Sequence, residues 1–203
     1  FAHVISAFMQ GMLEGLLDAM AENARARTDP MNGAVHVWAL SVTGRTEHAR
    51  VLLPRDEDQR LTSGFIAVAA WTMLAEAAAR CNDPDAGRTF LELLRPCRDQ
   101  IAGTRTGIVY AVAHAMGIVN SCVGDFDAAV EYLEHAIAIH ERMRAPFHLA
   151  YSQAALADVL VRYDAPGDRD RARHLATAAL EIGRARSYDY VVRDATDVLA
   201  RLA

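Results

Sequence analysis

The chain has 203 residues, of which 52% are hydrophobic and 23% are charged, a composition typical of globular proteins rather than disordered ones. Its formal net charge of −5 argues against a surface that binds the phosphates of nucleic acids. No apolar stretch reaches the roughly 18–20 residues that a membrane-spanning helix requires, so the sequence also argues against a membrane partner.

Apolar residues recur at steps of three and four over residues 2–25, which predicts one long N-terminal helix. This helix has a wide apolar surface, which leaves homodimerisation through it as an open alternative. Its large apolar residues are Phe1, Phe8, Met9, Met12 and Met20. Two shorter helices are predicted over residues 34–42 and 47–53, and Gly44 between them suits a left-handed helix end. Proline and charged residues over 54–60 predict an irregular connection.

Three further helix pairs follow, each with its own turn signal. Asp83 and Pro84 suit the N-cap and first turn of a helix, and Gly124 followed by Asp125 ends one helix and caps the next. Asp168 is the expected cap in the last pair. The predicted pairs span 61–81 with 84–94, 106–123 with 126–143, and 147–163 with 169–184.

Four small residues hold the same place in the second helix of each pair. Ala49, Gly87, Ala129 and Ala172 are spaced by 38, 42 and 43 residues, close to the ~34–47 residue period of two-helix repeats. Residues 187–202 have apolar side chains at helical spacing and are expected to cap the stack. No run shows the alternation of a strand. The sequence therefore predicts an all-α stack of antiparallel helical hairpins, an α-α superhelix with a C-terminal capping helix.

The third pair resembles the tetratricopeptide pattern, in which small residues let two helices approach closely. The matching residues are Met116, Gly117, Gly124, Asp125, Phe126, Ala129, Leu133 and Ala136. Residues 52–202 further resemble the tetratricopeptide-like region of large actinobacterial signalling ATPases, which occur as LuxR-type transcriptional regulators or as AAA/nucleotide-cyclase fusion proteins. The segments that carry this resemblance are 53–56, 74–78, 93–96, 124–129 and 165–172. The resemblance implies a non-catalytic regulatory or partner-sensing arm.

Several features place the chain in a cytoplasmic bacterial setting. All 21 basic residues are arginine, as expected of a GC-rich genome, and the absence of lysine excludes an ATP-binding P-loop. Cys81, Cys97 and Cys122 are odd in number and lack CxxC spacing, which predicts reduced, buried thiols. Phe1 stands where an initiator Met would be, so we expect residues 1–203 to be a single helical-repeat domain cut from a larger multidomain protein.

Stacked hairpins present their first helices as a continuous concave groove, where a ligand binds. By the tetratricopeptide register, six polar residues are predicted to point into this groove and to contact an extended peptide or a charged terminus. These candidate partner-binding residues are Glu76, Arg80, His114, Ser121, Tyr151 and Asp158.

The sequence supports a catalytic or metal-binding site less well than a partner-binding groove. Glu131 and His135 share a helix face at four-residue spacing, but no third ligand accompanies them. Ser121 and Cys122 are seven and eight positions from His114, without the turn that presents a nucleophile. We therefore assign no catalytic residue, no metal ligand and no cofactor.

The leading expectation is a non-catalytic protein-interaction or regulatory sensor domain of a bacterial signalling or transcriptional regulator. Its partner is a protein or peptide, or a neighbouring domain of the same chain, with no direct nucleic acid. The alternative is a small-molecule effector sensor that controls an adjacent ATPase, which a pocket lined by Trp71 and Tyr110 would favour. A helical enzyme is the third reading, and it lacks a convergent catalytic cluster.

Overall fold

The computed structural model describes residues 2–26, 30–54, 65–104 and 107–203, and it is mostly helical with one small two-stranded sheet. The predicted connection over 54–60 lies almost wholly outside these residues, as does the predicted start of the helix at residue 61. The α-helices are α1 (Ala2–Met9), α2 (Leu17–Ala26), α3 (Pro30–Val42), α4 (Thr46–Leu52), α5 (Phe65–Arg80), α6 (Pro84–Leu94), α7 (Val112–Val123), α8 (Phe126–Arg142), α9 (Pro146–Tyr163), α10 (Asp168–Arg186) and α11 (Asp189–Arg201). Two 3-10 helices, η1 (Leu13–Leu16) and η3 (Arg95–Cys97), and strands β1 (Ile101–Thr104) and β2 (Gly107–Ala111) complete these elements.

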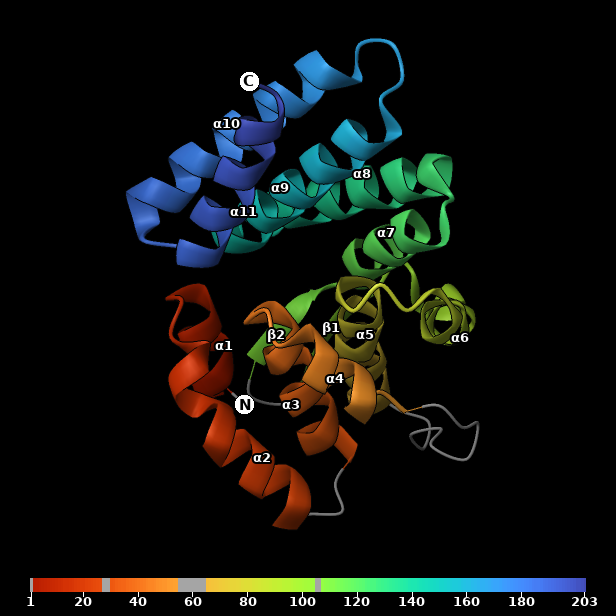
Figure 1. Ribbon diagram of the computed structural model, residues 1–203, viewed down its shortest axis with the longest axis vertical. Helices are drawn as coiled ribbons and strands as arrows, with labels where there is room; N and C mark the ends of the chain where they lie inside the picture. Colours follow the sequence, from red (N-terminus) through yellow and green to blue (C-terminus); the bar gives the residue numbers. More distant parts are fainter. Residues whose placement is uncertain (1, 27–29, 55–64, 105–106) are drawn as a thin grey trace.

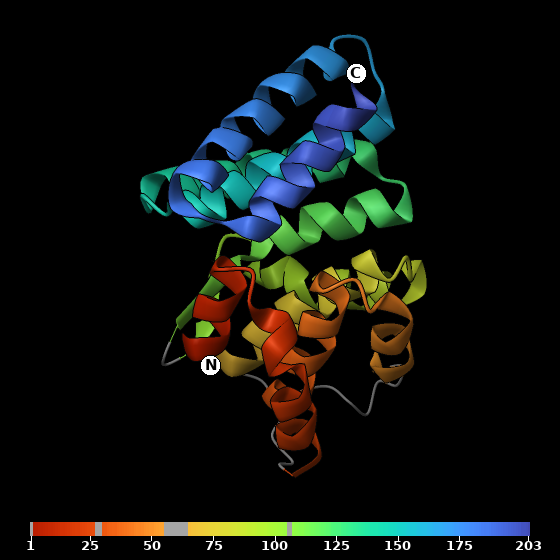
Figure 2. The same ribbon diagram turned by 60° about the vertical axis from the view of Figure 1, so that its left-hand side comes forward.

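Helices pack largely in chain order. The pairs α3 with α4, α5 with α6, α7 with α8, and α9 with α10 form hairpins, and α11 packs against both α9 and α10. Helices α8 to α11 form one end of the molecule and α1 to α6 the other, with α7 between them (Figures 1 and 2). No helix in the described part of the chain is long and apolar enough to cross a membrane.

The turn signals explain most hairpin boundaries. Gly44 and Gly124 adopt left-handed backbone angles, with φ of 83° and 89°, as expected of glycine at a helix end. The carboxylates of Asp83 and Asp125 accept hydrogen bonds from backbone N–H groups three residues on, at 3.2 and 3.1 Å. The fourth turn differs from the prediction, because Gly167 occupies the N-cap and Asp168 instead accepts a hydrogen bond from the Ala165 N–H at 3.0 Å.

The prediction of one helix over residues 2–25 is wrong. Helix α1 ends at Met9, and η1 precedes α2. Gly11 adopts a left-handed conformation with φ of 71°, and a Cβ at this position would lie 2.7 Å from the Cβ of Asp189. The chain therefore turns sharply where it meets the start of α11, a contact that only glycine permits without a shift.

The break lets α1 fold back onto the core. Phe8 is 2% exposed and packs edge-on against Trp38, Phe147 and Tyr151, with ring centroids 4.7, 5.0 and 5.4 Å away. Met20 is also buried, whereas Met12 is 55% exposed, and Phe1 lies outside the described residues. Most of the apolar surface that favoured homodimerisation is thus used within the chain.

The prediction of a chain without strands is also wrong. Strands β1 and β2 pair antiparallel, and α7 begins at Val112 rather than at residue 106, which lies outside the described residues. Ile108, Val109 and Tyr110 are β-branched or aromatic residues, which favour a strand. The short hairpin contacts α5 and buries Tyr110, which is 1% exposed.

The interior also corrects the expectation for the cysteines. Cys81 is buried and donates to the backbone oxygen of Thr46 at 3.3 Å, whereas Cys97 and Cys122 are partly exposed. The prediction of buried thiols therefore holds for the first cysteine alone.

Candidate functional site

A cleft of about 550 Å³ lies between α5, α7, α9 and α11. Three of these elements, α5, α7 and α9, are the first helices of consecutive hairpins, and α11 closes the cleft from the C-terminal side. The small side chains of Ala79, Ala154 and Ala155 leave the space, and apolar residues such as Ile118 and Val198 form part of the wall. The volume lies within the roughly 300–1,000 Å³ of typical ligand sites.

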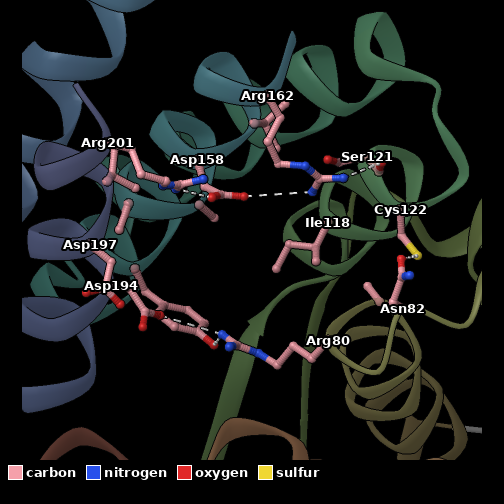
Figure 3. A pocket seen from close by; sticks show the side chains of 16 residues that line it. Arg80, Asn82, Ile118, Ser121, Cys122, Asp158, Arg162, Asp194, Asp197 and Arg201 are labelled. Carbon is pink, nitrogen blue, oxygen red and sulfur yellow. Dashed lines mark hydrogen bonds and ion pairs between the residues drawn. The ribbon is translucent and has the colours of Figure 1, made fainter. Parts of the chain in front are cut away.

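Charged side chains of both signs line this cleft. Figure 3 shows Arg162, Asp158 and Arg201 along one side, and Arg80 with Asp194 and Asp197 on the other. Arg80 comes from the last turn of α5, Arg162 and Asp158 from the second half of α9, and the other three from α11.

Arg80 is fixed by a polar cluster behind the cleft wall, which we call the Glu76 cluster. Glu76 is completely buried, and each of its carboxylate oxygens accepts two hydrogen bonds. The donors are the Trp38 Nε1–H at 2.9 Å, the Arg80 Nε–H at 2.8 Å, and the hydroxyls of Tyr110 and Tyr151. The cluster therefore joins α3, α5, β2 and α9 through one carboxylate.

The Glu76 cluster keeps its carboxylate ionised. Burial alone would raise the pKa of Glu76, but the nearby Arg80 charge and the tyrosine hydrogen bonds outweigh it and lower the pKa to about 2. Arg80 also donates through Nη2 to the Tyr151 oxygen at 2.6 Å. Its remaining exposed part faces the cleft, with Asp194 at 3.7 Å.

A second buried polar chain adjoins this cluster. His140 accepts the Ala111 N–H at Nε2 (3.0 Å), so its Nδ1 carries the proton and donates to Ser152 at 3.1 Å. The Ser152 hydroxyl also shares a hydrogen bond with His114 Nδ1 at 2.8 Å. Burial lowers the pKa of His114 to about 4 and that of His140 to about 3, so both rings are neutral at pH 7. Sequence reasoning missed Ser152 and His140.

The six predicted groove residues divide into two groups. Arg80, Ser121, Tyr151 and Asp158 line the cleft. Glu76 and His114 are completely buried and lie behind the wall, so their predicted placement in the groove is wrong. They pack inward because Glu76 is surrounded by four hydrogen-bond donors and the His114 ring stacks on Tyr151, with centroids 4.8 Å apart.

Sequence analysis missed four charged residues of the cleft: Arg162, Asp194, Asp197 and Arg201. The last three were overlooked because their segment was interpreted as a cap. Their spacing of three and four residues places them on one helix face, apart from the apolar positions, and this signal could have identified them.

The remaining sequence candidates do not gather into a reactive centre. His135 Nε2 lies 3.0 Å from the Asp99 carboxylate, so this histidine's observed partner is not the predicted neighbour Glu131. Within the described ranges, no group of three histidine, cysteine, aspartate or glutamate side chains could hold a metal ion.

Comparisons of the chain with protein-family models, with curated proteins and with solved structures find no match. The function proposed below therefore rests on the residues and on the cleft.

Proposed function

We propose that this chain is a tetratricopeptide-like, non-catalytic binding domain that recognises a segment of a protein partner in the cleft between α5, α7, α9 and α11. The observation that carries the proposal is that consecutive first helices, α5, α7 and α9, all contribute to one cleft. Helical-repeat domains bind extended segments on such a surface, because the repeats hold the side chains in place before the ligand arrives.

The small-residue register supports the repeat assignment. Ala49, Gly87 and Ala129 are each the fourth residue of the second helix in their hairpin, and Ala172 is the fifth in α10. All four are buried. The helices of the third hairpin approach closely, because a Cβ on Gly117 would lie 2.5 Å from Leu133 Cγ and 3.1 Å from the Ala129 oxygen. Helix pairs with this contact at regular intervals are the expected units of a superhelix.

Within this proposal the domain is a regulatory arm of a larger bacterial signalling protein. The cleft offers preorganised charges with apolar surface between them, a combination suited to reading a few side chains of a partner. The resemblance to the actinobacterial signalling ATPases favours regulation by contact with a protein or with a neighbouring domain.

One observation favours the second candidate, a small-molecule effector sensor. A cleft of about 550 Å³ also matches the size of a metabolite site. Trp71 and Tyr110, which would have favoured an effector sensor, do not line the cleft. The Tyr110 hydroxyl is hydrogen-bonded to Glu76, and Trp71 packs against the main hydrophobic core. We therefore place this candidate second.

A peptide-display selection against the wild-type domain tests the proposal. Ala155 is partly buried on the cleft wall, so Ala155→Trp should fill the cleft, whereas Ala185→Trp changes an exposed position on α10 outside it. We expect selected peptides to lose at least about tenfold in affinity with the first variant and none with the second, as measured by fluorescence anisotropy. If no peptide is enriched, or if both variants bind equally, peptide recognition in the cleft is ruled out, and a metabolite panel read by thermal shift then tests the second candidate.

A further inference from the structure

The side of the cleft formed by α7, α9 and α11 has an excess of positive charge. Arg162 and Arg201 share one carboxylate, that of Asp158. Arg201 is hydrogen-bonded to it, whereas Arg162 lies 3.8 Å away, beyond hydrogen-bond distance. Both arginine side chains remain 43% exposed. One carboxylate cannot satisfy two guanidinium groups, each of which has five N–H donors.

Arg162 is held in place without a full anionic partner. Its Nη2 donates to the backbone oxygen of Ser121 at 3.2 Å, and its guanidinium lies 5.6 Å from the ring centroid of Phe126. These two contacts fix the guanidinium on the cleft wall while leaving other N–H groups for a ligand.

Ser121, whose backbone oxygen accepts from Arg162, also carries a hydroxyl group. Ser121 is 2% exposed and lines the cleft, and its Oγ has no hydrogen-bond partner among the described residues. A buried hydroxyl without a partner costs free energy, so it marks a place where a polar ligand atom would be stabilised. Ser121 therefore contributes its backbone oxygen to the placement of Arg162 and its side chain to the same stretch of the cleft lining.

The side of the cleft that carries Arg80, Asp194 and Asp197 has an excess of negative charge. Arg80 is neutralised by Glu76 and lies 3.7 Å from Asp194. Asp197 is exposed at the cleft and makes no ion pair with any residue that the structure describes. Asp194 also pairs with Arg193 at 2.9 Å, so the charge that stays unbalanced on this side is that of Asp197, which favours a positive group on the ligand there.

We propose that the cleft binds a peptide segment that carries both a carboxylate and a cationic side chain, with the carboxylate on Arg162 and Arg201 beside Ser121 and the cation beside Asp197. This inference rests on the proposed function and names the chemistry of the ligand. Asp158 occupies the carboxylate position from within the chain, so the ligand competes with it for the two arginines.

Four fluorescein-labelled octapeptide pools test the charge requirement. Each pool is amidated and random except at two positions, which hold Glu and Lys, Glu and Gln, Gln and Lys, or Gln and Gln, three residues apart. We expect the Glu/Lys pool to bind best, with about a tenfold loss when Glu is replaced and a smaller loss when Lys is replaced, because the carboxylate gains charge-assisted hydrogen bonds.

Matched variants assign the two charges to their partners. Arg162→Gln should abolish the preference for Glu, and Asp197→Asn should abolish the preference for Lys, while Arg88→Gln, at an exposed side chain on α6, should leave both preferences intact. Asp158→Asn removes the internal competitor and should tighten binding of the Glu pools about threefold or more. An unchanged or weaker affinity in this variant would overturn the competition that we propose.

The outcomes separate this inference from the proposed function. If all four pools bind equally and Ala155→Trp still abolishes binding, the cleft binds peptides and the charge assignment is wrong. If no pool binds wild type, both proposals fail. Free glutamate and the dipeptide Glu-Lys, tested directly by thermal shift, identify the source of the charges, because binding of these compounds without binding of any pool contradicts a peptide ligand and supports the small-molecule candidate.

Discussion

The Glu76 cluster and the cleft use the same chemical groups in opposite ways. In the cluster, one buried carboxylate is surrounded by four donors, and the adjacent guanidinium of Arg80 is held on two sides. In the cleft, two guanidinium groups share one partly exposed carboxylate, and a neighbouring hydroxyl has no partner among the described residues. A satisfied buried group stabilises the fold, whereas exposed and incompletely paired groups remain available to a ligand. Substitutions in the Glu76 cluster should therefore lower the stability of the fold, whereas substitutions of the charged cleft residues should mainly weaken ligand binding.

The largest expected effect comes from breaking the Glu76 cluster. Glu76→Ala leaves Arg80 without its buried partner and three other donors unsatisfied, so it should lower the free energy of unfolding by about 3–5 kcal/mol. Urea denaturation measures the loss. Glu76→Gln keeps the shape and should lose less, and Glu47→Ala, whose side chain is 82% exposed, should change little. Equal losses for the Glu47 and Glu76 variants would contradict a structural role of the cluster.

Acid should destabilise the same buried region. Because the pKa values of His114 and His140 fall to about 4 and 3 in the folded protein, the unfolded state binds more protons than the folded state below pH 6.5. Stability should be level above about pH 7 and fall by about 1.4 kcal/mol per pH unit for each histidine as the pH drops towards 4. Glu76, with its pKa lowered to about 2 from 4.5, adds a further loss below pH 4.5.

Urea denaturation at a series of pH values measures this slope. Burial also lowers the pKa values of His36 and His148, so His140→Gln should reduce the slope between pH 6 and 5 without removing it, because one of several proton-binding differences is lost. His174→Gln, at an exposed position on α10, serves as the control and should leave the slope unchanged. A stability that does not depend on pH between 7 and 4 would mean that the two buried rings are not held neutral by the fold.

Tyr151 belongs to both the Glu76 cluster and the cleft, and its hydroxyl can be tested apart from its ring. Its hydroxyl donates to Glu76 and accepts from Arg80, while its ring lines the cleft. Tyr151→Phe keeps the ring and should lower stability by about 1.5–3 kcal/mol, the range for a hydrogen bond to a charged group. Tyr163→Phe removes an exposed hydroxyl bonded to Asp127 and should leave the thermal midpoint unchanged. If the two variants have similar thermal midpoints, the Tyr151 hydroxyl does not stabilise the fold through the Glu76 cluster.

The hairpins could be predicted because their boundaries are encoded locally. Gly124 and Asp125, for example, end one helix and cap the next through contacts within a few residues. The break at Gly11 and the β1–β2 hairpin could not, because they depend on distant partners: Gly11 meets Asp189, and Tyr110 reaches Glu76. Four of the six predicted groove residues line the cleft. The helical register indicated their face, but it could not show that Glu76 and His114 would be covered by side chains from other elements.

The smallest stability effect, and the sharpest test of the contrast, is expected at the cleft. Arg201→Gln removes an ion pair between side chains that are 43% and 39% exposed, and such pairs contribute less than about 1 kcal/mol. The thermal midpoint should therefore stay close to that of Arg88→Gln, whose surface ion pair with Asp85 is still more exposed to solvent screening. Binding of the Glu/Lys peptide pool should nevertheless fall about tenfold in the Arg201 variant alone. A large loss of stability with unchanged binding would mean that the charged residues of the cleft stabilise the fold, as the Glu76 cluster does. A ligand site behaves differently, because part of its charge stays unpaired until the ligand binds.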